Sequence, residues 1–242
     1  QDGFIEGEIN TGATPKSELT GRLKIQIYNL SWLELFSLDI SQPKGEITGE
    51  VELSGTRGEP LINGSYNVKD LSFQIPALGL KMSEGQITAK SHDNLAMLVK
   101  GSIKSGEGNM LITGLWDPAD QLPQPINLRM RAKEFTLADT PDMELVANSD
   151  VILTYEQGIY SLDGSLDLLK GLINLESIET AISISNDVVV VDPEPEKVQR
   201  DLLKLSINLA VTASDKLAIK GFGMDGFATG KLAVKSPYNG AT

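Results

Sequence analysis

The 242-residue sequence has no cysteine, a single histidine and few aromatic residues. Without cysteine, the chain forms neither a disulfide framework nor a thiolate metal site. One histidine is too few for the multi-histidine metal sites common in enzymes. That residue, His92, lies in a polar run that predicts a turn or a strand end. These absences argue against a metalloenzyme and against a small disulfide-stabilised domain.

Excess positive charge and long hydrophobic runs are also lacking. The formal net charge is -12, whereas a nucleic-acid-binding surface is basic, so we expect no nucleic-acid partner. We attribute the acidity to solubility. The apolar runs are much shorter than the ~20 residues of a membrane-spanning helix. The strand pattern begins at residue 3 without a leader peptide, and we expect a segment of a longer protein.

What the chain has instead is a repeated seven-residue phrase, clearest at residues 47–53, ITGEVEL. Apolar residues and one glycine occupy alternate positions, and polar residues occupy the others. Because side chains alternate across a β-strand, the phrase has one apolar and one polar face. Copies occur at residues 19–25, 62–68, 162–168 and 228–234. Repetition of such a strand predicts a long sheet with a single apolar face.

The pattern predicts an all-β fold with one short helix. Alternation indicates about eighteen strands, more than the roughly ten that an open sheet holds without curving or dividing. Residues 30–38 break the alternation and predict the helix, with Ser31 as its N-cap. The proline-rich stretch 117–125 is a weak candidate for a boundary, because the strand pattern resumes directly after it. We therefore expect one continuous unit over residues 1–242.

The glycines inside these phrases require an explanation, since glycine in a strand interior is destabilising. Glycine relieves crowding on a concave face and permits sharp bending, so we interpret these positions as points of curvature. The alternatives are β-bulges and loose packing. The predicted strand-bending glycines are Gly21, Gly49, Gly64, Gly101, Gly114, Gly164 and Gly230.

Three architectures accommodate such strands. They are a β-sandwich with a filled core, a closed barrel, and a long sheet folded lengthwise into a trough with an apolar inside. A membrane barrel is disfavoured, because it needs aromatic girdles and aromatic residues make up only 5% of the chain. On the residues alone, the sandwich is favoured over the trough.

The sequence contains no catalytic constellation. Residues 221–226 match GxGxxG, but an alternating strand pattern follows, where a dinucleotide site needs a helix. We interpret this stretch as a tight turn between two strands. Carboxylates are numerous, yet no pair stands on an apolar background as an acid–base couple would. We predict a protein that is not an enzyme and that has no cofactor and no metal.

Several stretches resemble the TamB family, within the broader AsmA-like group. The most specific is residues 217–232, LAIKGFGMDGFATGKL, which is similar to a glycine-rich signature of that family. Other phrases typical of the family are DVVVVD at 187–192, TPDMEL at 140–145, PLING at 60–64 and PALGL at 76–80. The resemblance covers nearly the whole chain.

The resemblance implies a β-taco, a long antiparallel sheet curled around an open hydrophobic groove. It also implies a periplasmic protein, anchored in the inner membrane by an N-terminal helix that this chain does not include. Its C-terminal part is expected to meet an outer-membrane barrel of the Omp85 type, similar to TamA. The implied role is lipid passage between the membranes, or assembly of barrel proteins in the translocation and assembly module.

Residues and resemblance together predict a groove that holds phospholipid acyl chains for transport between the inner and outer membranes. An alternative is a scaffold for the assembly of outer-membrane barrel proteins or autotransporters, which would use exposed edge strands. An ordinary β-sandwich binding module is the third hypothesis. The predicted groove lining is the apolar part of the repeated phrase: Leu23, Ile25, Val51, Leu53, Tyr66, Val68, Leu166, Leu168, Ile207, Leu209, Leu232 and Val234.

Overall fold

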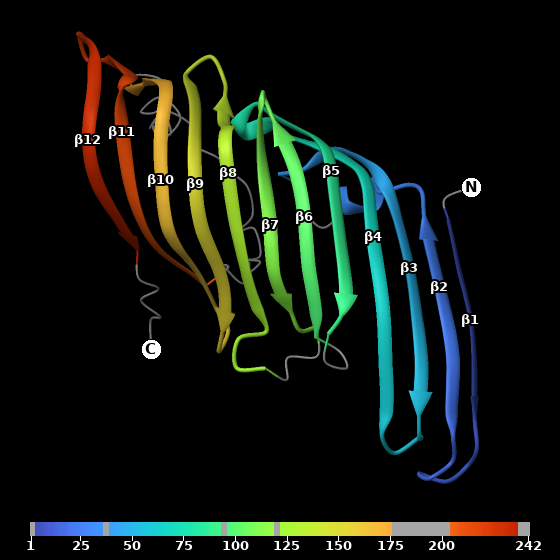
Figure 1. Ribbon diagram of the computed structural model, residues 1–242. Helices are drawn as coiled ribbons and strands as arrows, with labels where there is room; N and C mark the ends of the chain where they lie inside the picture. The colour runs from blue at the N-terminus through green and yellow to red at the C-terminus, as the bar shows by residue number, and fades with distance from the viewer. Residues whose placement is uncertain (1–2, 36–38, 93–95, 119–121, 176–203, 237–242) are drawn as a thin grey trace, which may run out of the picture.

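One long curved sheet makes up the fold. The computed structural model describes residues 3–35, 39–92, 96–118, 122–175 and 204–236. Their twelve strands lie side by side in the order in which the chain makes them (Figure 1). The strands are β1 (Gly3–Thr11), β2 (Leu19–Ile27), β3 (Ser41–Gly55), β4 (Pro60–Ile75), β5 (Leu80–Ser91), β6 (Met97–Ser105), β7 (Gly108–Trp116), β8 (Ile126–Asp139), β9 (Met143–Glu156), β10 (Ile159–Asn174), β11 (Leu205–Gly221) and β12 (Met224–Ser236).

The predicted all-β, taco-like sheet is confirmed. All described strands belong to this one sheet, so the described residues do not form the two packed layers of a sandwich. Neighbouring strands pair antiparallel, except that β10 and β11 are parallel. A parallel neighbour needs a crossover connection of about a dozen residues or more. The chain between Asn174 and Leu205 is long enough for one.

The strands are longer and fewer than the sequence pattern predicts. The stretches 60–69 and 71–76, expected to be two strands, are both in β4, and 79–82 and 85–90 both lie mostly in β5. The polar residues between them are β-bulges, where one extra residue is accommodated and the ladder continues. The predicted strands at 180–185 and 187–191, and a predicted helical turn at 198–204, lie outside the described residues.

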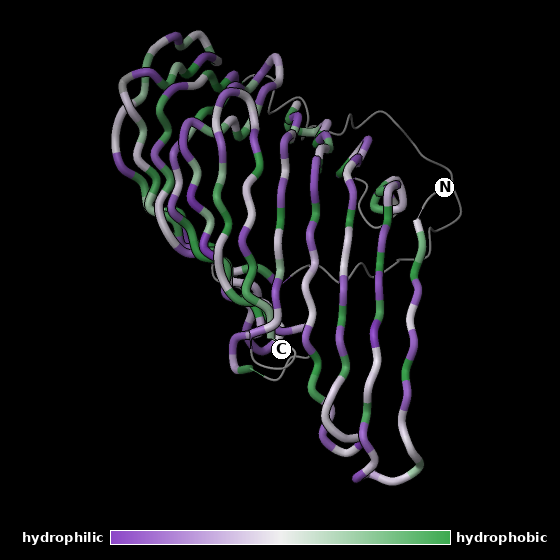
Figure 2. Tube along the Cα trace, turned by 45° about the vertical axis from the view of Figure 1, so that its right-hand side comes forward, coloured by the Kyte–Doolittle hydropathy of each residue, from purple (hydrophilic) through white to green (hydrophobic). Residues whose placement is uncertain are grey.

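The bulges lie at a similar level on neighbouring strands. Asp70 in β4, Glu84 in β5 and Glu134 in β8 have φ angles of 51°, 50° and 50° and lie beside register shifts. Further shifts occur after Leu168 in β10 and after Ala213 in β11. Because a bulge bends its strand, a line of bulges bends the sheet along that line. Figure 2 shows the resulting curvature, strongest over β8–β12.

A short helix lies where the sequence predicts one near residues 30–38, and it is of the 3₁₀ type. The structure has a 3₁₀ helix, η1 (Ser31–Leu35), and residues 36–38 lie outside the described part. Asn29 caps it instead of Ser31, because the Asn29 side-chain oxygen accepts the backbone N–H of Ser31 at 2.9 Å. A second 3₁₀ turn, η2 (Pro76–Leu78), connects β4 to β5.

Several of the best-buried side chains gather where β5 and β8 extend past the hairpin of β6 and β7. Leu80, Phe135 and Ala138 are almost completely buried there. The Ser105 hydroxyl, at the hairpin end, donates to the backbone oxygen of Thr136 at 2.9 Å. Across most of the remaining sheet, apolar side chains are only half-buried. None of the helices within the described residues is long and apolar enough to span a membrane.

Candidate functional site

An unbroken row of apolar and glycine residues crosses the whole sheet. Residues directly opposite each other in paired strands share a face, so the register places one residue of each strand in this row. We call this side of the sheet the apolar face. The row runs Gly3, Ile27, Ile47, Val68, Ile87, Gly101, Ile112, Met130, Val151, Gly164, Leu209 and Val234.

A second row lies beside the first on the same face. It contains one polar residue, Ser236, at the edge strand β12. Two adjacent rows of this kind make a continuous apolar surface across twelve strands. The second row runs Ile5, Ile25, Gly49, Tyr66, Ala89, Val99, Gly114, Leu128, Leu153, Leu162, Ile207 and Ser236.

All twelve predicted groove residues lie on the apolar face. Ile25, Tyr66 and Ile207 are in the second row, and Val68, Leu209 and Val234 are in the first. The other six belong to shorter rows on either side: Leu23, Val51, Leu53, Leu166, Leu168 and Leu232. The structure therefore brings them together on one surface; that they bind lipid stays a prediction.

The exposure of these residues matches an open surface better than a closed core. Val51 is 9% exposed, whereas Leu232 is 65% and Val234 is 37% exposed. The other nine predicted residues are half-buried. A sandwich core would bury most of them completely, because its two layers interdigitate. Among the described residues no second layer covers this face.

The apolar face continues to both edges of the sheet. On β1, Ile5 and Ile9 are 68% and 67% exposed. On β12, Leu232 is 65% exposed. Within the described residues neither edge strand has a partner on its outer side. Both edges thus present exposed apolar side chains together with unpaired backbone groups.

The predicted strand-bending glycines occupy positions in these apolar rows. At Gly49 an added Cβ would lie 2.7 Å from the ring of Tyr66 on the adjacent strand, so the glycine makes room for that ring. Gly164 has a φ of 147°, which disfavours any other residue. Six of the seven lie away from register shifts, and Gly230 borders one. Bending at the glycines themselves remains a prediction.

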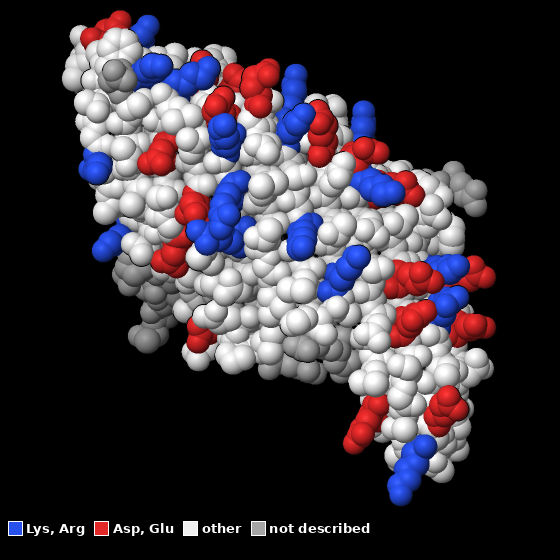
Figure 3. Space-filling model, in the orientation of Figure 1, with Lys and Arg blue, Asp and Glu red and all other residues white. Residues whose placement is uncertain are grey.

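The opposite side of the sheet, which we call the polar face, carries the charges (Figure 3). The Arg22 guanidinium bonds Glu52 at 3.0 Å and lies 3.5 Å from Glu50, which ties β2 to β3. The Arg129 guanidinium on β8 donates two hydrogen bonds to the Asp150 carboxylate on β9 in a bidentate arrangement. Hydrogen bonds from Arg129 hold the pKa of the Asp150 carboxyl below its ordinary value. These charged side chains make solvent exposure of the polar face favourable.

Sequence reasoning missed several residues of the apolar face. For the most part it took the apolar residues that follow the glycine of each full phrase, and it passed over those that precede the glycine or lie on strands without a full phrase. Alternation alone would have found these positions, since the apolar residues keep the same spacing. The missed members include Ile47, Ile87, Ile112, Met130 and Val151.

The chemistry available here is adsorption of apolar groups. Within the described residues, no three His, Asp or Glu side chains come together in a way that could hold a metal ion. The GxGxxG stretch is the tight turn that the sequence predicts, since Gly221 ends β11 and β12 begins at Met224. Phe222 and Gly223 form that turn with φ angles of 52° and 75°.

Two comparisons with known proteins match this chain. The family model described as "TamB C-terminal domain" matches residues 96–242, more than half of the chain. The protein named "Translocation and assembly module subunit TamB" from Haemophilus influenzae is 23% identical over 248 residues. That match covers 96% of this chain but only 19% of the relative. No solved structure matches the chain. The chain belongs to the TamB C-terminal domain family.

Proposed function

We propose that this chain is a segment of a periplasmic bridge whose apolar face holds acyl chains while phospholipids move between the inner and outer membranes. The observation that carries the proposal is the continuous, half-exposed apolar surface across twelve strands. At about 4.8 Å per strand, this surface extends roughly 50 Å along the sheet. Contiguous apolar surfaces of that size on soluble proteins mark binding sites.

The energetics of lipid transfer favour such a surface. Each CH₂ group removed from water contributes about 0.8 kcal/mol, so an acyl chain leaves a bilayer only at high cost without an apolar host. Similar side chains recur in each strand and offer many sites of nearly equal affinity. A chain bound to one of these sites can move to the next without a deep trap. The polar face meanwhile keeps the sheet soluble.

Family membership supports a proposal for the cellular location and the partners of this chain. The Haemophilus influenzae relative is named as a subunit of a translocation and assembly module, and this chain spans about a fifth of it. We propose that the full-length protein is anchored in the inner membrane by an N-terminal helix and crosses the periplasm. A barrel partner of the Omp85 type, similar to TamA, would receive its C-terminal part at the outer membrane.

A lipid-binding assay with two arginine substitutions on one strand tests the proposal. Leu209 lies in the first row of the apolar face. Its neighbour Ala210 is exposed on the polar face. We expect the purified chain to carry phospholipid that native mass spectrometry detects. Leu209→Arg should lower the bound lipid at least fivefold, because a charge interrupts the apolar row, whereas Ala210→Arg should leave it unchanged.

Two outcomes would contradict the proposal. If Leu209→Arg unfolds the chain while Ala210→Arg does not, the apolar row is a closed core. If both variants fold and carry as much lipid as the original chain, the row is not the binding surface. Circular dichroism melts of both variants separate these cases.

A second function, as scaffold for outer-membrane barrel proteins or autotransporters, rests on the sheet edges. Exposed Ile5 and Phe227 lie on edge strands whose outer backbone groups have no strand partner among the described residues, which suits the addition of a strand from a client protein. Photo-crosslinkers at Ile5 and Val68 distinguish the two functions. Polypeptide adducts at the edge position favour the scaffold, and lipid adducts at Val68, in the middle of the apolar face, favour transfer.

A further inference from the structure

The polar face departs from its polar pattern on β6 and β7. Leu98 and Leu115 are directly opposite each other there, in a row that holds Lys90 on β5 and Asn127 on β8. Leu98 is 45% exposed. Adjacent exposed apolar residues on an otherwise charged face indicate a possible interaction site. They are also unrelated to the proposed lipid surface, which is on the other side of the sheet.

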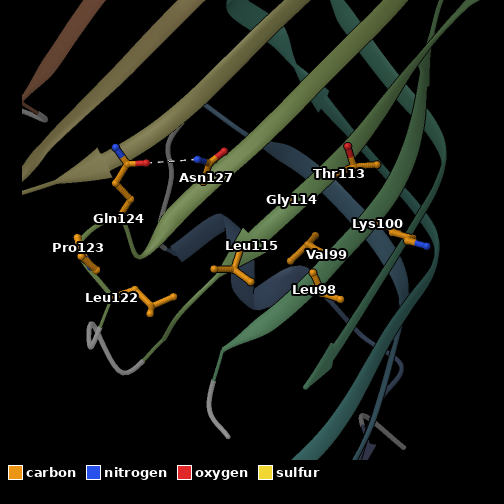
Figure 4. A pocket seen from close by; sticks show the side chains of 10 residues that line it. All are labelled: Leu98, Val99, Lys100, Thr113, Gly114, Leu115, Leu122, Pro123, Gln124 and Asn127. Atoms are coloured by element: carbon orange, nitrogen blue, oxygen red, sulfur yellow. Dashed lines mark hydrogen bonds between the residues drawn. The ribbon is translucent and has the colours of Figure 1, made fainter. Parts of the chain in front are cut away.

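A loop turns these two leucines into a pocket. Leu122 and Pro123 from the β7–β8 connection line it together with Leu98 and Leu115, and its volume is about 730 Å³ (Figure 4). The loop is fixed at its base, since the Asp117 carboxylate accepts the backbone N–H of Leu122 at 2.9 Å. Gln124 accepts a hydrogen bond from the Asn127 side chain at 3.3 Å. These two hydrogen bonds position Leu122 and Gln124 at the pocket.

Positive charge surrounds this pocket, although the chain as a whole carries -12. The polar face of β5, β6 and β8 presents a set of cations that we call the basic patch, visible across the middle of Figure 3. Lys100 lines the pocket and shares a row with Arg129. The basic patch consists of Lys90, Lys100, Lys104, Arg129, Arg131 and Lys133.

The patch is only partly neutralised. Lys104 contacts Glu84 at 2.7 Å, and Arg129 and Arg131 share Asp150. Lys90, Lys100 and Lys133 have no ion pair among the described residues. Within the described residues, this face thus combines unpaired cations with a partly apolar pocket.

We propose that the basic patch and its pocket are a docking surface for an acidic polypeptide segment that inserts an apolar side chain beside Leu98 and Leu115. Charge complementarity selects the acidic partner and speeds its association. The pocket supplies the buried apolar contact that typically dominates binding energy. An anionic membrane surface fits less well, because the polar face of β5–β8 has no aromatic residue at its described positions.

A random twelve-residue peptide library displayed on phage tests the docking surface. Selection on the folded chain should enrich peptides in which Asp and Glu surround a Leu, Ile or Phe. Binding of these peptides should weaken at least tenfold with Lys100→Glu and with Leu98→Ser. Lys24→Glu reverses the same charge on the polar face of β2 and should change the affinity less than twofold.

Two results would overturn the proposal. One is a selection without acidic bias, or selected peptides that bind Lys100→Glu as well as the original chain. The other is binding to vesicles with one-quarter phosphatidylglycerol that depends on Lys100, which would assign the face to a membrane. Melting curves of each variant confirm folding. The lipid content of the chain should not change with Lys100→Glu, so this test is independent of the proposed function.

Discussion

Few apolar residues of this sheet are almost completely buried, and Phe135 is a large one among them. It is 3% exposed, on β8, opposite Ala147 of β9. Most apolar residues on the same face are half-exposed and contribute less, since the hydrophobic contribution grows with the area removed from water. The β6–β7 hairpin end therefore contributes a large share of the stability, while much of the remaining face is only half-buried.

Replacing Phe135 by alanine tests this contribution. The change leaves a cavity in a site that cannot collapse freely, so we expect a loss of about 3–5 kcal/mol in the free energy of unfolding. Urea denaturation followed by circular dichroism measures it. Phe227→Ala, at a side chain that is 75% exposed, should cost less than about 0.5 kcal/mol. Equal losses in the two variants would show that burial is not concentrated at this end.

Asp150 provides a pH-dependent contribution on the polar face. Its folded-state pKa is lowered by hydrogen bonds from Arg129. A lowered pKa stabilises the fold above the unfolded-state value, and this stabilisation is lost as the pH falls through the folded value. We expect Asp150→Asn to lower the urea midpoint at pH 7, with the difference from the original chain vanishing in strong acid.

The control for Asp150 is another carboxylate on the same face. Asp167→Asn removes an exposed charge on β10 that has no ion pair within the described residues. Its urea midpoint should follow the original chain at both pH values. Since the Asp150 pair is exposed, the effect should also shrink in high salt. A difference for Asp150→Asn that persists in strong acid would contradict the assignment.

At the scale of elements, bulges decide how the strands curve. Glu134 adopts a φ of 50° on β8, and its backbone N–H donates to the Asn148 side chain at 2.8 Å. The extra residue allows Phe135 to point into the buried cluster. Removing it would move the following residues by one position and reverse their faces. The bulge is thus part of the pattern and not an irregularity in it.

Two changes at Glu134 separate the bulge from its side chain. Deleting Glu134 should destabilise the chain at least as much as Phe135→Ala, because it exposes apolar residues of the strand end. Glu134→Gly should stay within about 1 kcal/mol of the original chain, since relief of the left-handed conformation offsets the greater entropy of the unfolded state. Thermal melts compare both. A deletion that melts normally would show that the strand adapts without its bulge.

At the scale of the whole molecule, the described residues form a single curved layer, and none of them covers its two edges or its apolar face. A sheet edge with exposed apolar side chains is a template for association. Leu232 on β12 is 65% exposed, and the neighbouring Ala233 lies on the polar face. In the intact protein we expect further strands or a partner to cover these edges, which the isolated chain leaves in water.

This exposure predicts self-association of the isolated chain. Leu232→Lys should lower the fraction of dimers and larger species at least severalfold, because a lysine opposes edge-to-edge contact. Sedimentation velocity measures the distribution. Ala233→Lys adds the same charge on the other face and should have a smaller effect. If the two variants behave alike, net charge and not the apolar edge controls association.

The sequence by itself determined the all-β class and the two faces of the strands, because strand alternation is local and survives any tertiary arrangement. All twelve predicted groove residues accordingly lie on one face. Only the tertiary structure decided that residues 60–75 form one bulged strand and that β10 and β11 are parallel. A bulge and a turn use the same polar residues, and strand neighbours depend on distant pairing. The local sequence pattern likewise did not predict the single layer of the described residues, since an alternating strand fits a sandwich and a trough equally well.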